Sequence, residues 1–264
     1  MPNRPVDVDT KQVFKDLFLR RNKYEIDDRF VLNDGKRHPL AILVPGGGYQ
    51  MVCSFIEGVP IAKKLNELGV SAIIVYYHVR NKGRHPIPLD DLAQAIKTIL
   101  DNRNKYNLEK DNYSIWGSSA GGHLTASFGT DNIGYLKYDL PKPGALILSY
   151  PVITMNPEYT HMGSHDNLLG KDAGKQLEEE TSVEKHIHNQ YPDTFIWCFD
   201  QDDTVPSKNT IEMKKALDKY QIRNECLIYK GTLHGVGPGN QTPAEGWIEK
   251  AYNFWRRNNE KTTI

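Results

Sequence analysis

The chain has 264 residues, a length that fits one large α/β domain or two small ones. Lysine plus arginine and aspartate plus glutamate number 33 each, so the formal net charge is zero, which argues against a nucleic-acid partner. The segment 1–30 has no apolar core of signal-peptide length and no run of about 18 apolar residues could cross a bilayer, so we expect a cytoplasmic protein without a membrane partner.

Apolar, β-branched runs alternate with amphipathic runs along most of the chain. Runs of the first kind predict strands at 40–44, 70–77, 113–117, 144–153, 193–200 and 225–231. Runs of the second kind predict helices at 60–69, 88–106, 123–129, 207–220 and 244–257. Strands that alternate with helices predict an α/β protein, in which a mostly parallel central sheet carries helices on both faces.

Two segments depart from this alternation. The sequence Asn33-Asp34-Gly35 is typical of a hairpin turn, so we expect the first strands to be antiparallel. Residues 155–192 are polar and rich in histidine and glutamate, and we expect them to leave the sheet and form a small cap over one edge. The chain has no internal repeat and no Gly/Ser linker, which favours a single domain over 1–264.

Residues 117–121 read Gly-Ser-Ser-Ala-Gly, which matches G-x-S-x-G with Ser119 at its centre. The match lies between a predicted strand and a predicted helix, where a nucleophilic serine occupies a strained turn and needs small neighbours. A small-residue turn that only allows close helix–sheet packing is the competing interpretation. Ser118 is a second candidate nucleophile, but the pattern places Ser119 at the apex of the turn.

A second glycine cluster, PGGGY at 45–49, directly follows the strand predicted at 40–44. Successive glycines expose backbone N–H groups and let a ligand approach the chain closely. A phosphate-binding loop would need a G-K-[ST] or G-x-G-x-x-G sequence, and neither occurs here. The position at a strand end, well before the serine, favours a loop that stabilises an oxyanion.

A nucleophilic serine requires a histidine that takes its proton and a carboxylate that orients the histidine. His234 lies in the glycine-rich sequence YKGTLHGVGPG, between a predicted strand and the last helix, as expected of a catalytic base. His123 follows Ser119 by one helical turn, so we assign it a structural role. Four further histidines lie in the segment 155–192: His161, His165, His186 and His188. Their HxxxH and HxH spacings lack a matching carboxylate pattern, so we expect a solvated loop there and no metal site.

The carboxylate is ambiguous from spacing alone. Asp200, Asp202 and Asp203 all lie where the strand predicted at 193–200 ends. Any of the three could orient the histidine, and carboxylates at this position could instead cap the helix that follows Pro206.

Four motifs, GSSAGGHL, PGGGY, DQDDTVP and LHGVG, together resemble the α/β-hydrolase superfamily. Within it the chain is similar to the small bacterial carbohydrate-esterase-like hydrolases, relatives of acetyl xylan and feruloyl esterases. The resemblance covers about 25–258 and implies an α/β-hydrolase fold. The chain differs at Pro45, where many esterases have the histidine of His-Gly-Gly-Gly, and this shifts the expected substrate towards acylated sugars. It also differs at Phe199, where a glycine often precedes the acid.

The resemblance also implies roles for individual residues. The acid of this family commonly stands three residues before the valine of a D-x-x-V-P segment, which is the position of Asp202 here, with Asp203 as the reserve. The backbone N–H groups of Gly47, Gly48 and Ala120 are implied to form the oxyanion hole.

Together these features predict a serine esterase that hydrolyses carboxylic esters, with small acyl groups on sugars or related alcohols, through an acyl-enzyme. We expect a small-molecule ester substrate and a reaction that needs no cofactor and no metal. Cys53, Cys198 and Cys226 lack the CxxC spacing of a zinc site and should be reduced. Tyr49 is a candidate for stacking on a sugar ring, although packing in the core is the commoner role of an aromatic side chain. A prolyl-oligopeptidase-type peptidase and a non-catalytic ligand-binding protein on the same fold are the alternatives. The oligomeric state stays open, a homodimer included.

Overall fold

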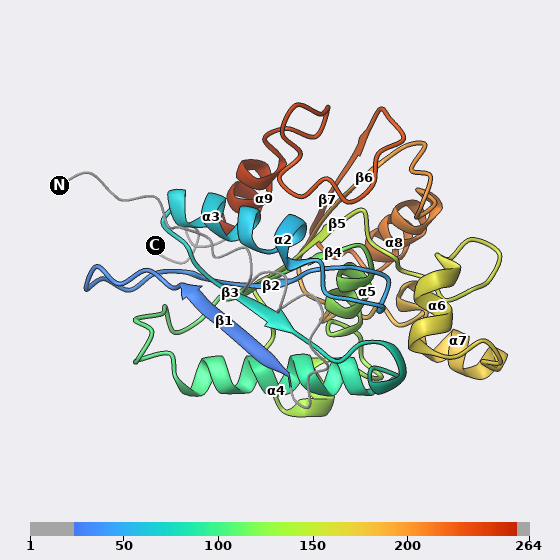
Figure 1. The fold of residues 1–264 in the computed structure, drawn as a ribbon, viewed down its shortest axis with the longest axis horizontal. Helices are drawn as coiled ribbons and strands as arrows, with labels where there is room; N and C mark the ends of the chain where they lie inside the picture. The colour runs from blue at the N-terminus through green and yellow to red at the C-terminus, as the bar shows by residue number, and fades with distance from the viewer. Residues whose placement is uncertain (1–23, 258–264) are drawn as a thin grey trace.

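The computed structural model describes residues 24–257 and has one seven-stranded sheet at its centre, shown in Figure 1. The strand order is β1-β3-β2-β4-β5-β6-β7; β2 to β7 run parallel, and β1 runs antiparallel to β3. The strands are β1 (Glu25–Phe30), β2 (Leu40–Val44), β3 (Ser71–Tyr76), β4 (Ser114–Ser118), β5 (Ala145–Ser149), β6 (Thr194–Phe199) and β7 (Asn224–Tyr229). Every residue of β2 to β6 is buried, because parallel strands are covered on both faces.

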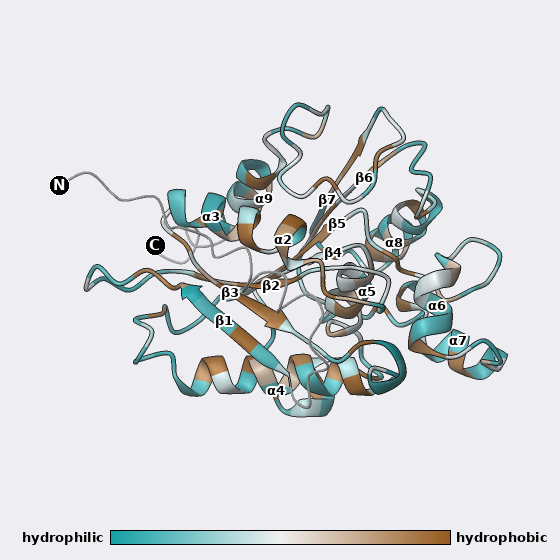
Figure 2. Cartoon of the chain, viewed as in Figure 1, coloured by the Kyte–Doolittle hydropathy of each residue, from teal (hydrophilic) through white to brown (hydrophobic). Residues whose placement is uncertain are grey.

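Helices cover both faces of the sheet, as the sequence predicts. On one face α3 packs against β3 and α9, and on the other α5 packs against β4, β5 and α4 (Figure 1). The helices are α2 (Ser54–Glu57), α3 (Val59–Glu67), α4 (Ile87–Asp101), α5 (Ser119–Ser127), α6 (Met162–Leu168), α7 (Lys175–Thr181), α8 (Lys208–Lys219) and α9 (Trp247–Arg256), with 3-10 turns η1 (Arg80–Lys82), η2 (Tyr135–Tyr138) and η3 (Val183–Lys185). Figure 2 shows hydrophobic residues concentrated along the central strands and hydrophilic residues on α6 and α7.

The strand order places two glycine-rich loops next to each other. From β2 the chain passes to β3 on one side and then to β4 on the other side, so the order reverses around β2. Ligands of α/β proteins bind at such a reversal, beyond the carboxyl ends of the strands. Val44 at the end of β2 is in register with Gly117 in β4. The PGGGY loop and the G-x-S-x-G turn therefore leave the sheet side by side.

The hairpin predicted at 33–35 does not pair β1 with β2. Strand β1 is antiparallel, as expected, but it pairs with β3, with Glu25 opposite Tyr76. Strand β2 already has parallel neighbours on both edges, β3 and β4, so β1 cannot pair with it and pairs with the outer edge of β3. Gly35, whose φ is +80°, lies in the bend between the two strands.

Residues 155–192 leave the sheet between β5 and β6 and fold into α6, α7 and η3, drawn in yellow tones in Figure 1. The expected solvated loop is wrong for His165, which is buried and contacts Asp166 and Glu178 through its two ring nitrogens, at 3.0 and 3.1 Å. Asp166 lies in α6 like His165, and the contact with Glu178 joins α6 to α7. The single domain over 1–264 stays a prediction, since the structure describes 24–257.

Candidate active site

Ser119 occupies the turn between β4 and α5 with a left-handed φ of +53°, a conformation that costs a non-glycine residue energy. Its neighbours have to be small. A Cβ added at Gly117 would collide with the Gly121 carbonyl oxygen and the Thr125 side chain, and one added at Gly121 would collide with the Val44 carbonyl oxygen. The glycines of G-x-S-x-G therefore permit the strained turn that holds Ser119.

The three side chains that the sequence analysis selected lie in one hydrogen-bonded row. The Nε2 atom of His234 lies 2.8 Å from the Ser119 hydroxyl, and Nδ1 lies 2.8 Å from Asp202 Oδ2. The Asp202 side chain is fully buried, and its Oδ1 accepts the backbone N–H groups of Thr204 and Val205 at 2.9 and 2.8 Å. A carboxylate held in this way presents its second oxygen to His234 in a defined direction.

The structure separates the three aspartates that spacing alone left open. Asp200 pairs with Lys230 at 2.7 Å and accepts the Gly231 N–H at 3.0 Å. Asp203 accepts the Thr204 hydroxyl at 2.9 Å. Of the three, Asp202 is the one in contact with the histidine, in line with the D-x-x-V-P position. The rival serine, Ser118, bonds to Tyr150 instead.

The PGGGY loop lies directly against the serine. A Cβ added at Gly46 would lie 2.7 Å from the Ser119 Cβ, so only a residue without a side chain fits this contact. Gly47 and Gly48 have φ values of +120° and +64°, and both line the same pocket as Ser119. Ala120 lies in the first turn of α5, where backbone N–H groups have no acceptor within the helix. Gly47 and Gly48 thus lie in the pocket wall with Ser119, and Ala120 directly follows it in the chain; their role as an oxyanion hole stays a prediction.

Glu57 is a buried carboxyl group that no motif in the sequence predicts. It is 5% exposed, lines the pocket, and accepts the Gly46 N–H at 2.7 Å. Burial raises its pKa, while hydrogen bonds from Gly46 and Tyr150 and the charge of His234 act in the opposite direction. The only signal in the sequence was an acidic residue within the otherwise apolar stretch SFIEGVPIA.

Tyr150 extends this contact to the loop that carries His234. Its hydroxyl bonds to Glu57 and accepts the backbone N–H of Gly237 at 3.2 Å. Its ring lies edge-on to the His234 imidazole, with 4.8 Å between the ring centroids. Glu57 and Tyr150 thus connect the PGGGY loop with the histidine loop, two segments that must keep their relative positions for the site to work.

Tyr49, expected to contact a sugar ring, points into the core instead. Its side chain has no exposed surface, and its hydroxyl lies 2.8 Å from Nδ1 of His123. Nε2 of His123 donates to the Thr181 carbonyl oxygen at 2.8 Å, so Nδ1 is the acceptor for Tyr49. Burial lowers the pKa of His123 to about 4, which keeps the ring neutral. Tyr49 and His123 therefore form a structural pair, and the predicted substrate contact of Tyr49 is wrong.

The pocket beside Ser119 has a volume of about 340 Å³, which suits a small ligand. His161, Gly163 and Asn167 of the 155–192 segment form part of its wall, so this segment borders the site. Cys53 also lines the pocket, but burial raises its pKa to about 11, so its thiol is not an activated nucleophile. Within 24–257 no cluster of three or more His, Cys, Asp or Glu side chains is arranged to hold a metal. No helix in this part of the chain is long and apolar enough to cross a membrane.

The sheet order and the serine turn define an α/β-hydrolase fold, which agrees with the resemblance seen in the sequence. An acetyl ester-xyloside bifunctional hydrolase from Caldicellulosiruptor lactoaceticus has a similar structure, with a TM-score of 0.79 and 28% identity over 87% of this chain and 86% of that one. MGS-M1, an alpha/beta hydrolase from a deep-sea metagenome library, aligns with a TM-score of 0.68 and 23% identity, over 92% of this chain and 94% of that one.

The family follows from the sequence comparison. The BD-FAE model matches residues 30–217, and the chain belongs to the BD-FAE family. It is 30% identical to endo-1,4-beta-xylanase B of Butyrivibrio fibrisolvens over 234 residues, 85% of this chain and 36% of that protein. It is 31% identical to an acetylxylan esterase of Xylanibacter ruminicola, over 80% of this chain and 46% of that protein. The chain thus spans less than half the length of either of these curated relatives.

Proposed function

We propose that this protein is a serine esterase that hydrolyses small acyl groups, acetyl above all, from sugars or related alcohols through an acyl-enzyme. The observation that carries the proposal is the row in which His234 lies 2.8 Å from both the Ser119 hydroxyl and the Asp202 carboxylate. This arrangement is the one that turns a serine hydroxyl into a nucleophile.

In the first half of the reaction the Ser119 oxygen attacks the carbonyl carbon of the ester, and Nε2 of His234 takes the hydroxyl proton. The carbonyl electron pair moves onto the oxygen. Asp202 keeps the proton on Nδ1 and stabilises the imidazolium that forms. When the tetrahedral intermediate collapses, His234 returns its proton to the departing alcohol, and the acyl group stays on Ser119. Water then attacks the acyl-enzyme by the same route and releases the acid.

The oxyanion formed in each half accepts hydrogen bonds from the backbone N–H groups of Gly47, Gly48 and Ala120. Gly47 and Gly48 lie in the PGGGY loop and Ala120 in the first turn of α5, and backbone donors of this kind need little reorganisation when charge develops. Each such donor typically contributes about 100- to 1000-fold in rate.

The proposed substrate class is supported by the relatives, whose names include acetylxylan esterase and acetyl ester-xyloside hydrolase. The pocket volume of about 340 Å³ suits an acetylated sugar unit better than a long-chain lipid. A cytoplasmic location and a homodimer stay predictions from the sequence.

The first test uses a fluorophosphonate, from which an activated serine oxygen displaces fluoride, and follows the mass of the intact protein. We expect one adduct on the wild type and none on Ser119→Ala, with labelling of His234→Ala slowed at least about 1000-fold. The wild type should then release acetate from acetylated xylose. An unlabelled wild type would favour the ligand-binding alternative, and faster cleavage of prolyl amides than of acetyl esters would favour the peptidase.

A further inference from the structure

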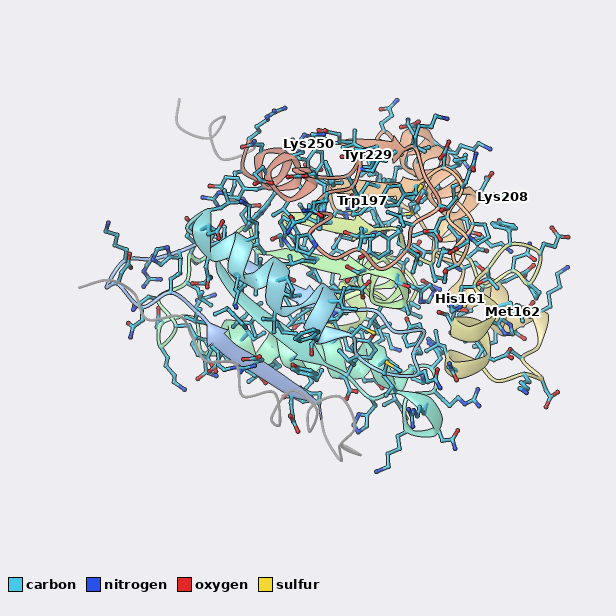
Figure 3. The ribbon with its side chains drawn as sticks, turned by 45° about the horizontal axis from the view of Figure 1, so that its top comes forward. His161, Met162, Trp197, Lys208, Tyr229 and Lys250 are labelled. Atoms are coloured by element: carbon cyan, nitrogen blue, oxygen red, sulfur yellow. The ribbon has the colours of Figure 1, made fainter. Side chains whose placement is uncertain are left out.

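His161, which the sequence analysis placed in a solvated loop, belongs to the wall of the active-site pocket. It is the N-cap residue of α6 and lines the pocket together with Ser119 and His234. Figure 3 shows it at the start of α6, next to Met162. Its ring lies close to the PGGGY loop, because a Cβ added at Gly48 would be 3.5 Å from its Cε1 atom.

The hydrogen bonds of His161 define which ring nitrogen carries the proton. Nδ1 accepts the backbone N–H of Ser164 at 3.3 Å and lies 2.9 Å from the Ser164 hydroxyl. A nitrogen that accepts a backbone N–H has no hydrogen of its own, so the neutral ring carries its hydrogen on Nε2. Burial lowers the pKa of His161, and the charge of His234 lowers it further against the opposing charge of Asp202. The ring therefore stays neutral at neutral pH, with Nε2–H as a donor.

The Nε2 edge of His161 is open because residue 163, whose backbone lies beside it, is a glycine. A Cβ added at Gly163 would lie 3.2 Å from Nε2 and 3.0 Å from Cε1. Gly163 itself lines the pocket and has no side chain to cover the ring. A ligand in the pocket can therefore reach the Nε2–H group.

Asn167 adds an acceptor from the same helix. It lines the pocket, and its Nδ2 donates to the carbonyl oxygen of Gly48 at 2.9 Å. Because a carbonyl oxygen can bond only to the amide nitrogen, the orientation of the side chain is settled. The Oδ1 atom of Asn167 therefore remains available to accept a hydrogen bond from a ligand.

We propose that His161 and Asn167 form a subsite for the hydroxyl groups of the alcohol part of the ester. Nε2–H of His161 donates to one hydroxyl oxygen of a sugar ring, and Oδ1 of Asn167 accepts the hydrogen of a hydroxyl. A donor and an acceptor from one short helix suit a polyol and offer nothing to an alcohol without hydroxyl groups. This inference rests on the proposed esterase function and names the feature of the substrate that the 155–192 segment selects.

The test compares kcat/KM for two acetate esters of similar size, methyl acetyl-β-xyloside and cyclohexyl acetate, which has no hydroxyl group. His161→Asn removes Nε2–H but keeps a side chain that can cap α6, and Gly163→Ala places a methyl group against Nε2. We expect the ratio of kcat/KM, xyloside over cyclohexyl ester, to fall about tenfold in both variants. Met162→Ala, at the exposed neighbouring position, is the control and should keep the wild-type ratio.

A ratio within about twofold of the wild type in His161→Asn and Gly163→Ala, with both proteins melting as cooperatively as the wild type, would overturn the subsite. The esterase proposal fails separately, since a wild type that hydrolyses neither ester contradicts the function and not the subsite. An equal loss on both esters would also overturn the subsite, because it would assign His161 to the shared acyl chemistry and not to the alcohol.

Discussion

Replacing Glu57 by alanine removes the buried carboxyl that lies between the two loops of the site. The backbone N–H of Gly46, now 2.7 Å from Glu57 Oε2 and inside the protein, would lose its acceptor. A buried donor without a partner costs about 1–3 kcal/mol. The hydroxyl of Tyr150 would lose one of its partners as well, and the truncation leaves a void. We expect the free energy of unfolding to fall by about 3 kcal/mol, measured by urea denaturation. We also expect kcat to fall, because Gly46 and His234 lie on the loops that Glu57 and Tyr150 connect.

Glu57→Gln is the matched control, because glutamine keeps the shape and an oxygen for the Gly46 N–H. It should cost only about 1 kcal/mol at low pH. Burial raises the pKa of Glu57 above the ordinary value of 4.5, so the folded wild type binds this proton more tightly than the unfolded chain does. The contribution of Glu57 to the stability of the wild type must then fall as the pH rises from 4.5 through the raised pKa, whereas glutamine cannot ionise.

The measurement is therefore the difference in unfolding free energy between wild type and Glu57→Gln at several pH values from about 4.5 to 8. The other titratable groups that act on Glu57 or that it acts on, His234, Cys53, Tyr77 and Tyr150, are the same in both proteins. We expect glutamine to gain on the wild type as the pH rises. A difference that stays constant over this range, or a Glu57→Ala protein as stable as the wild type, would refute the reasoning.

Three further substitutions test the rest of the site. Asp202→Asn should lower kcat by about 10⁴-fold, because the amide no longer holds the correct tautomer of the histidine; a loss below about tenfold in steady-state assays would contradict this role. Gly46→Ala would place a Cβ 2.6 Å from the Ser118 carbonyl oxygen, so we expect a loss of about 1–3 kcal/mol in urea denaturation and slow fluorophosphonate labelling, and wild-type labelling would be inconsistent with the close contact. Tyr49→Phe leaves the buried Nδ1 of His123 without a donor, so the free energy of unfolding should fall by about 1–3 kcal/mol while KM stays unchanged. A raised KM would indicate that Tyr49 contacts the substrate.

Local features of the sequence were sufficient for the class of fold and for the serine. The alternation of apolar and amphipathic runs predicts the parallel sheet, because strands buried on both faces must be apolar throughout. The glycines around Ser119 predict its position, because its left-handed backbone and its close neighbours demand small residues within two positions. The three successive glycines of the PGGGY loop are also visible in the sequence: Gly47 and Gly48 have positive φ values, and Gly46 is required by its contact with the distant Ser119.

What remained open depended on contacts between distant parts of the chain. His234 is separated from Asp202 by 32 positions and from Ser119 by 115, so spacing could not choose between Asp200, Asp202 and Asp203, and the family motif was needed. The hairpin turn signal at 33–35 could not predict that β1 pairs with β3, because the edges of β2 are occupied by strands from later in the chain.

The environment of individual side chains was decided by the tertiary structure alone. Tyr49 faces the core and His161 faces the pocket, although both stood in segments whose sequence allowed either direction. Glu57 belongs to the site only because folding buries its carboxyl group beside the PGGGY loop, where it accepts the Gly46 N–H. Backbone strain leaves a signal in neighbouring residues, whereas burial and hydrogen-bond partners come from elements brought together by folding. The sequence by itself therefore determined the fold class and the serine, and the tertiary structure decided which side chains surround it.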